Sequence, residues 1–258
     1  MRKIWRSLRR RKGRAESGLF LLEGPTLVAE ALASPTGLKS VVVTDEARET
    51  DAGRAILRRC ADAGVPTEIV AEREFAELVD TVTPQGVAGV AGIPARGWQD
   101  VTGPRILVLD GIQDPGNVGT LIRTAEALGL GGVVCLPGTA DPWSPKVTRG
   151  AAGSTLRLAV LKGSWPDVLQ ELRSRGISVW VTDTTGIEQR RGDAVPPGLA
   201  LVLGNEACGV SDDVRRSADR RVSIGMADTV ESLNVAAAGA ILIDRIFVTE
   251  GPAATEPV

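Results

Sequence analysis

The stretch LVLDGIQDPGNVGTLIRTAEALGL, residues 107–130, has the pattern of a buried strand, a glycine-bearing turn and an amphipathic helix. Units of this kind begin many anion-binding sites, because the first N–H groups of a helix have no partner within the helix. The turn contains neither GxGxxG nor GxxxxGK[ST]. Its conspicuous polar residues are instead Asn117, which suits a helix N-cap, and Arg123.

Arg123 falls outside the apolar stripe of the expected helix, which consists of Leu121, Ile122, Ala125 and Leu128. One turn toward the helix start, Gly119 and Thr120 are small and leave room for a ligand above the guanidinium. We therefore expect Arg123 to point, with the helix N-terminus, at an anionic group. An ordinary surface arginine paired with Glu126 is equally compatible with the spacing.

The pattern of this first unit repeats through the second half of the chain. Near-continuous apolar strands interleaved with helices predict a parallel sheet that is buried on both faces. Ligands of such sheets bind at the carboxyl ends of the strands. The expected strands are 105–110, 132–137, 155–160, 177–183, 199–204 and 220–225, and the expected helices lie near 117–128, 145–151, 165–175, 211–217 and 233–248.

A smaller α/β domain is expected before this sheet. Its strands are predicted over 18–24, 40–45, 66–71 and 86–93, with helices near 25–33, 51–63 and 72–79. A loop-rich stretch with two prolines and three glycines, residues 92–105, separates the two regions. The expected division is a basic arm over 1–16, a small domain over 17–95, a linker over 96–104, a large domain over 105–250 and a disordered tail over 251–258.

Charge is distributed unevenly along the chain. The net charge is −2, yet residues 1–14 contain eight Lys or Arg and no acid. Such an arm is a candidate RNA contact, although a solvated, frayed terminus would have the same composition. Trp5 within it could stack on a base, but packing against its own domain is the expected role. The candidate RNA contacts are Arg9, Arg10, Arg11, Lys12 and Arg14, with Lys146 and Arg149 further along the chain.

The amino-acid composition excludes several kinds of catalytic and metal-binding site. The chain has no His and no Tyr, so a Ser-His-Asp triad and a histidine metal site are impossible. Three distant cysteines without a CxxC predict neither a zinc site nor a disulfide framework. No apolar segment has the roughly 20 residues of a membrane span, and none follows the basic start as in a signal peptide. We expect a cytoplasmic protein that uses no metal.

Two further loops carry polar residues at the same edge of the expected sheet. Gly204, Asn205 and Glu206 follow a buried strand, where a carboxylate either serves a site or bonds to loop amides. In the last loop Ser232 can cap the final helix, with Asn234 inside its first turn. Small residues on both sides of that helix suit close packing against another helix, from this chain or a second subunit.

Together these three loops resemble the three sequence motifs of the SpoU (TrmH) family of RNA ribose 2′-O-methyltransferases. The first motif matches Asn117, Gly119 and Arg123, the second matches residues 204–206, and the third matches residues 232–235. The segment 141–154 is similar to a stretch between the family's first two motifs. The N-terminal part resembles the ribosomal-protein-like substrate-binding domain that is often fused to these enzymes, through LFLLEGPTLVAEAL and TPQGVAGVA.

The resemblance implies a fold that periodicity does not supply. It implies a SPOUT-type methyltransferase domain that ends in a deep trefoil knot, although knots are otherwise rare. It also implies a dimer formed through this domain, with the active site completed across the interface. S-adenosylmethionine would bind in the knot, largely to backbone groups around Thr182, Gly204, Ile224, Met226 and Leu233.

The resemblance assigns catalysis to Arg123, with Asn117 orienting it or the ribose and Glu206 holding the loop or Arg123. Ser232 and Asn234 would fix the third loop. Because arginine stays protonated in proteins, clamping the neighbouring phosphate suits Arg123 better than accepting a proton. Departures from the family pattern are mild: Ala207 stands where glycine is usual, and Gly225 where proline is usual.

The implied activity is methylation of a ribose 2′-hydroxyl, with ribosomal RNA and guanosine favoured over transfer RNA. Two rivals remain open at this point. A dinucleotide-dependent oxidoreductase suits an alternating α/β chain but lacks its glycine fingerprint. A non-catalytic RNA-binding ribosome-assembly factor could keep the fold, yet it has no reason to retain Asn117, Arg123, Glu206 and Asn234 together.

Overall fold

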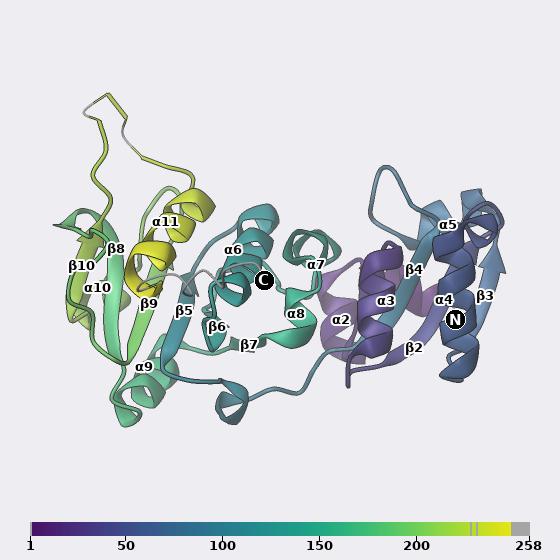
Figure 1. Ribbon diagram of the computed structural model, residues 1–258, viewed down its shortest axis with the longest axis horizontal. Helices are drawn as coiled ribbons and strands as arrows, with labels where there is room; N and C mark the ends of the chain where they lie inside the picture. The colour runs from purple at the N-terminus through teal and green to yellow at the C-terminus, as the bar shows by residue number, and fades with distance from the viewer. Residues whose placement is uncertain (1, 228, 231, 249–258) are drawn as a thin grey trace, which may run out of the picture. The chain divides into compact units, whose positions relative to one another are not determined.

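The computed structural model describes residues 2–227, 229–230 and 232–248, and the tail expected over 251–258 lies outside them. The chain forms two compact units (Figure 1). The first contains the residues up to Ala95 together with Asp141–Arg157. The second contains Arg96–Ala140 and the chain from Leu158 onward.

The first unit is built on a mixed four-stranded sheet in the order β1-β4-β2-β3. β4 pairs antiparallel with β1 and β2, and β3 pairs parallel with β2. The strands and the helices between them fall close to where the sequence predicts them: β1 (Leu19–Glu23), α3 (Pro25–Ala33), β2 (Leu38–Thr44), α4 (Asp51–Asp62), β3 (Thr67–Val70), α5 (Glu72–Leu78) and β4 (Val87–Gly92). A short 3-10 helix (Ala47–Glu49), which the sequence did not predict, lies between β2 and α4.

The basic start of the chain is folded and is not an extended arm. It forms α1 (Arg2–Leu8) and α2 (Arg11–Ser17). Trp5 and Leu8 are buried in the core of the first unit, which confirms that Trp5 packs against its own domain. Burial of these two side chains fixes α1 on the sheet, so a frayed terminus is also wrong for residues 2–16.

Arg14 is buried, and the expectation that it contacts RNA is wrong. Its guanidinium donates to the Asp141 carboxylate from Nε at 2.8 Å and from Nη2 at 2.6 Å, and to the Leu8 carbonyl from Nη1 at 2.7 Å. Only 3% of Arg14 is exposed, because these partners satisfy the charge inside the unit. The same ion pair holds Asp141, the first residue of the returning segment, in the first unit.

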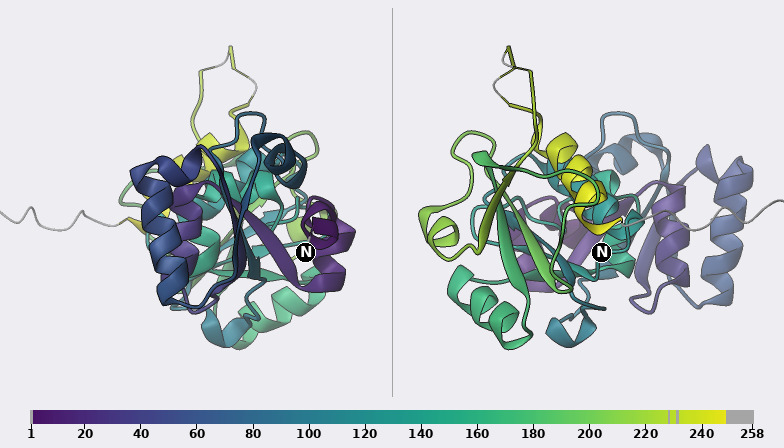
Figure 2. Two further views of the ribbon diagram at one scale, coloured as in Figure 1. Left: turned by 90° about the vertical axis from the view of Figure 1, so that its right-hand side faces the viewer. Right: turned by 60° about the vertical axis from the view of Figure 1, so that its left-hand side comes forward.

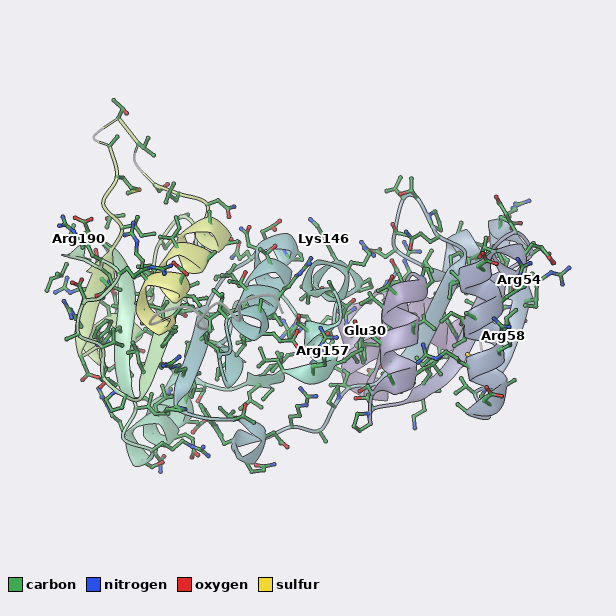
Figure 3. All side chains as sticks on the ribbon, in the orientation of Figure 1. Glu30, Arg54, Arg58, Lys146, Arg157 and Arg190 are labelled. Carbon is green, nitrogen blue, oxygen red and sulfur yellow. The ribbon has the colours of Figure 1, made fainter. Side chains whose placement is uncertain are left out.

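The returning segment, Asp141–Arg157, belongs to the first unit, whereas the expected domain boundaries placed it in the large domain. It forms α7 (Pro145–Ala151), which Ser144 caps, and α8 (Ser154–Arg157). Trp143 packs on Phe20 of β1 at 5.1 Å, and an ion pair joins Arg157 to Glu30 of α3 (Figure 3). The strand expected over 155–160 is also wrong at its start, since β7 begins only at Ala159.

The second unit is a six-stranded sheet in the order β10-β8-β9-β5-β6-β7, and every pair is parallel. The predicted parallel α/β class is therefore confirmed. Its strands are β5 (Arg105–Asp110), β6 (Gly132–Cys135), β7 (Ala159–Lys162), β8 (Ser178–Glu188), β9 (Leu199–Gly204) and β10 (Arg220–Ser223).

Helices cover both faces of this sheet (Figure 2). On one face α9 (Trp165–Ser174) and α10 (Asp212–Arg216) pack on alternate strand residues such as Val108 and Val202, beside a short 3-10 helix (Trp98–Asp100). The other face carries α6 (Pro115–Ala127) and α11 (Val235–Phe247). A Cβ added to Gly239 would lie 2.4 Å from Leu121 and 2.7 Å from Leu203, so glycine lets α11 approach both α6 and β9.

Pairing between β8 and β10 is irregular. Arg221 pairs with Val181, but Val222 pairs with Ile187, so residues 182–186 leave the ladder. A Cβ on Gly186 would meet the backbone of Arg221 and Val222 at 2.8 Å, and glycine therefore permits this close passage. The trefoil knot implied by the resemblance stays a prediction. No helix among the described residues is long and apolar enough to cross a membrane.

We expect Arg14→Ala to lower the free energy of unfolding of the first unit by about 3 kcal/mol, because it removes one member of a buried ion pair with Asp141. Urea unfolding followed by the fluorescence of Trp5 and Trp143 measures the change. Arg10→Ala is the matched control, since Arg10 is exposed, and it should change the stability little. Equal stability of the two variants would show that the ion pair does not hold the returning segment.

Candidate active site

Two neighbouring strands of the second unit end side by side at the candidate site. β5 and β9 pair in register, so that Asp110 lies opposite Gly204. A Cβ on Gly204 would come within 2.2 Å of the backbone of Gly209 and Val210. Glycine at this position therefore allows the chain to turn back tightly on the end of β9.

The turn after β9 is fixed by Asn205. Its backbone exchanges two hydrogen bonds of 2.9 Å with Gly209. Its side-chain Oδ1 accepts from the N–H groups of Ala207 and Cys208, and its Nδ2 donates to the carbonyl of Gly111 at 2.8 Å. Gly209 takes the left-handed conformation (φ 70°), and Ala207 does not, so alanine at 207 carries no backbone strain.

Asp114 caps α6, and the expectation that Asn117 does so is wrong. The Asp114 carboxylate accepts from the backbone N–H of Asn117 at 2.9 Å, and Pro115 occupies the first helical position. The dipeptide Asp-Pro was the signal for this start, since proline suits the first turn and aspartate the cap. With its backbone held by Asp114, Asn117 has its side chain available for other partners.

The side chain of Asn117 joins the three motifs. Its Nδ2 donates to Glu206 Oε1 at 3.0 Å, and its Oδ1 accepts from Asn234 Nδ2 at 3.1 Å. Asn117 belongs to α6, Glu206 to the turn after β9, and Asn234 to the start of α11. Residues that are 117 positions apart in the chain thus form one hydrogen-bonded cluster.

The third motif contributes Asn234 to this cluster. Asn234 is the N-cap of α11, because its Oδ1 accepts from Ala236 N and Ala237 N. The expectation that Ser232 caps this helix is therefore wrong, and Ser232 and Leu233 are exposed. Asn234 uses its oxygen for the helix and its Nδ2 for Asn117, so the cap and the cluster share one side chain.

Arg123 lies two turns into α6 and is exposed, outside the buried stripe, as predicted. No described residue accepts a hydrogen bond from its guanidinium or forms an ion pair with it, so the alternative of a pair with Glu126 is not formed. The Glu206 carboxylate is engaged by the neutral amide of Asn117. The guanidinium is therefore available to an external anion.

Of the five expected cofactor contacts, two lie on adjacent strands. Thr182 of β8 donates from Oγ1 to the Val202 carbonyl of β9 at 3.3 Å, next to Gly204. Ile224 and Met226 are half-buried in the segment after β10. No hydrogen bond between described residues joins these two, or Leu233, to Thr182 or Gly204.

Asp183 is a candidate cofactor contact that the sequence analysis did not single out. Its Oδ1 accepts from Thr185 N at 2.9 Å and Thr185 Oγ1 at 2.8 Å. These bonds, the backbone N–H first, lower the pKa of Asp183, and the positive charges of Arg215 and Arg221 add to the effect. The carboxylate is therefore ionised at neutral pH.

The environment of Asp183 fits a cationic cofactor. Oδ2 is buried and accepts no hydrogen bond from the described residues, although Arg215 and Arg221 lie 3.7 and 3.8 Å away. A buried acceptor of this kind is costly unless a ligand donates to it. Next to Thr182 and Gly204, it suits the hydroxyl or ammonium groups of a molecule such as S-adenosylmethionine.

The expected RNA contacts all belong to the first unit. Arg10, Arg11 and Lys146 are exposed, while Arg9 lies 3.5 Å from Asp80 and Lys12 lies 3.8 Å from Glu16. Arg149 is half-buried and pairs with Glu23. Within the described part of the chain, no three His, Cys, Asp or Glu side chains gather in a group that could hold a metal ion.

Comparison with known families matches almost the whole chain. Residues 104–244 match the model of the SpoU rRNA Methylase family, and residues 3–89 match an MRM3-like substrate binding domain. The first match includes Asp141–Arg157, which fold with the N-terminal unit.

Individual proteins agree with these matches. The chain is 35% identical over 241 residues, 93% of either protein, to the 23S rRNA (guanosine(2553)-2′-O)-methyltransferase RlmP of Bacillus subtilis. It resembles the crystal structure of the SpoU methyltransferase AviRb from Streptomyces viridochromogenes in complex with AdoMet, with a TM-score of 0.83 and 27% identity. This match covers 94% of the present chain and 95% of AviRb. An AdoMet-bound rRNA methyltransferase from Sinorhizobium meliloti gives a TM-score of 0.82 at 27% identity, with coverage of 94% and 92%.

Fold, motifs and matches together define an S-adenosylmethionine-dependent RNA methyltransferase. The chain belongs to the SpoU rRNA methylase family. The resemblance seen in the three motifs is thereby confirmed, and the dinucleotide-dependent oxidoreductase is not supported. The roles of individual residues stay predictions.

We expect Asn117→Asp to lower the single-turnover methylation rate about 100-fold near neutral pH, because the new carboxylate would oppose Glu206 at hydrogen-bond distance and displace the cluster. Like charges raise the pKa of a carboxyl group. The defect is therefore present above that raised pKa and is relieved as the pH falls through it.

Asn117→Ala is the matched control, because it removes both hydrogen bonds without adding a charge. Its rate, divided by the wild-type rate at the same pH, should not change with pH. A parallel pH profile for the two variants would contradict a contact between positions 117 and 206.

Proposed function

We propose that this protein transfers a methyl group from S-adenosylmethionine to the ribose 2′-hydroxyl of a guanosine in 23S ribosomal RNA. The hydrogen-bonded cluster of Asn117, Glu206 and Asn234 carries the proposal, because it unites residues of three separate motifs, and Arg123 lies on the same helix as Asn117. The choice of RNA and base rests on the relative from Bacillus subtilis, which matches along 93% of this chain.

The ribose hydroxyl is a poor nucleophile at neutral pH, so it must be positioned and helped to lose its proton. S-adenosylmethionine supplies an activated methyl group on a sulfonium. As the hydroxyl oxygen forms its bond to the methyl carbon, the carbon–sulfur bond breaks and the hydroxyl proton passes to a water molecule, which gives a 2′-O-methyl ribose, S-adenosylhomocysteine and a hydronium ion.

Arg123 has the position and the chemistry to clamp the RNA. Arg123 is exposed two turns into α6, and its guanidinium carries N–H donors in a planar fork that matches a pair of phosphate oxygens. Bound to the phosphate next to the target ribose, Arg123 holds the hydroxyl in place and stabilises the negative charge that develops on its oxygen. Arginine does not accept the proton in this scheme, because it remains protonated.

Asn117, Glu206 and Asn234 are positioning residues. Their hydrogen bonds fix the N-termini of α6 and α11 against the turn after β9. Thr182, Asp183 and Gly204 would hold the methyl donor at the ends of β8 and β9, next to this turn. Ile224, Met226 and Leu233 complete the cofactor site in the proposal.

The proposed enzyme acts as a homodimer through the second unit, and its reaction takes place in the cytoplasm on ribosomal RNA. The small residues of α11 support the dimer, since Ala237 is exposed on a helix that already approaches α6 closely. The proposal includes the trefoil knot of the family in the C-terminal part of the second unit.

We expect Arg123→Ala to retain S-adenosylmethionine binding and to lower the methylation rate by about 100-fold or more, because it removes a group that acts on the reacting RNA. Isothermal titration with the cofactor and single-turnover transfer of radiolabelled methyl measure the two effects. Arg123→Lys keeps the charge without the planar fork and should restore only part of the rate. Wild-type turnover in the alanine variant would remove Arg123 from the mechanism.

The RNA target is tested by mapping ribose methylation across total RNA from cells with and without the gene. The proposal predicts the loss of one 2′-O-methylguanosine in 23S rRNA. Loss of a ribose methyl from transfer RNA instead would contradict the choice of substrate while leaving the chemistry in place.

A further inference from the structure

The first unit contains a pocket of about 240 Å³ under the loop that connects α5 to β4. Its apolar side is formed by Phe75 and Val79, at the end of α5, and by Val87, at the start of β4. These three side chains belong to the core, so they hold a fixed surface at the base of the pocket. Pockets for drug-sized ligands measure roughly 300–1,000 Å³, and this smaller one suits a single ring system.

Polar groups surround the opening. Thr81, Thr83 and Gln85 line the pocket and offer both donors and acceptors of hydrogen bonds. A flat ligand with polar edges could therefore form hydrogen bonds to the rim.

One side of the pocket is formed by a fixed guanidinium. Arg149, from α7, lines the pocket and forms an ion pair with the buried Glu23 at the end of β1. The other carboxylate oxygen of Glu23 accepts from the N–H of Asp80 at 2.6 Å. Because Glu23 is held from two directions, the plane of Arg149 is held in place, and such planes stack on nucleic-acid bases.

A larger, open groove of about 800 Å³ adjoins the pocket at Asp80. The cations Arg6, Arg9, Arg10 and Lys12 line this groove, together with Glu16, Glu77 and Asp80. Ion pairs engage Arg6 and Arg9, but Arg10 forms none with the residues that the structure describes. A phosphate backbone that follows the groove would bring the adjacent nucleotide to the pocket.

We propose that this pocket binds one unstacked base of the substrate RNA, with the base against Arg149 and its edges on Thr81, Thr83 and Gln85. Sequence-specific RNA recognition mostly uses unpaired bases that stack on planar side chains and bond through their edges. The inference rests on the proposed RNA substrate and goes beyond it, since it assigns a second contact point in a unit that does not contain Arg123.

The test measures binding of an in vitro transcript of bacterial 23S rRNA to the full-length protein, at constant salt. We expect Arg149→Lys and Gln85→Ala each to weaken binding about tenfold, as the loss of one stacked base does. The lysine variant keeps the positive charge and the partner of Glu23, so its defect reports the planar group and not the charge.

Arg58→Gln is the matched control for a lost surface cation. Arg58 is exposed on α4 of the same unit, outside both the pocket and the groove (Figure 3). It should change the affinity less than twofold. Thermal unfolding of each variant verifies the fold, and Gln85→Ala keeps the test valid if a change at Arg149 destabilises the unit, because Gln85 is exposed.

A second readout uses a transcript that contains 4-thiouridine. Ultraviolet cross-links should fall on the loop over residues 79–86 or on α7, and the variants should raise KM for the RNA while kcat is retained. Wild-type affinity in both variants, or cross-links confined to the second unit, would overturn the pocket assignment.

The two proposals fail in different ways. If the wild-type protein methylates the transcript and the pocket variants bind it normally, only the pocket assignment is wrong. If the wild-type protein neither binds nor methylates the transcript, both the pocket assignment and the choice of 23S rRNA are wrong.

Discussion

The site of this enzyme depends on one amide side chain, that of Asn117. An amide has both a donor and an acceptor, and here the donor contacts Glu206 while the acceptor contacts Asn234. The three residues come from α6, the turn after β9 and α11, so the contact requires the in-register pairing of β5 with β9 and the close approach of α11 at Gly239. Glu206 accepts a hydrogen bond from the neutral amide of Asn117, so its hydrogen-bond partner is not Arg123. That separation leaves the guanidinium to the RNA phosphate in the proposed mechanism.

Much of the fold follows from the sequence because the physical signals are strong and local. Apolar runs such as RILVLD and LALVLG are strands within a residue of their predicted bounds, since only strands buried on both faces tolerate such continuous apolarity. The motif residues of the site were predicted as well. Their contacts were not, because the choice between Asn117 and Asp114, or between Ser232 and Asn234, as the N-cap depends on where each helix begins. Helix boundaries vary by a residue or two in any pattern-based prediction.

Contacts between residues far apart in the chain could not be predicted from local sequence patterns. Arg14 has the appearance of a free cation in a basic segment, and only the folded chain brings Asp141 to it across 127 positions. For the same reason the sequence placed Asp141–Arg157 in the methyltransferase domain, whereas this segment packs on β1 and α3. One consequence is functional: Arg149, which lies between the first two motifs in sequence, lines the pocket of the substrate-binding unit. Asp183 was not singled out, because the sequence pattern does not show its ion pairs with Arg215 and Arg221, which lie more than 30 positions away in the chain.

The most direct test of the central claim is a crystal structure with S-adenosylmethionine bound. The methyl donor should lie at the carboxyl ends of β8 and β9, against Thr182, Asp183 and the turn at Gly204, with its methyl group directed toward Arg123 of one protomer and the Asn117 cluster intact. A donor bound elsewhere, with its methyl group far from Arg123 of both protomers, would contradict the assignment of this cluster as the catalytic site.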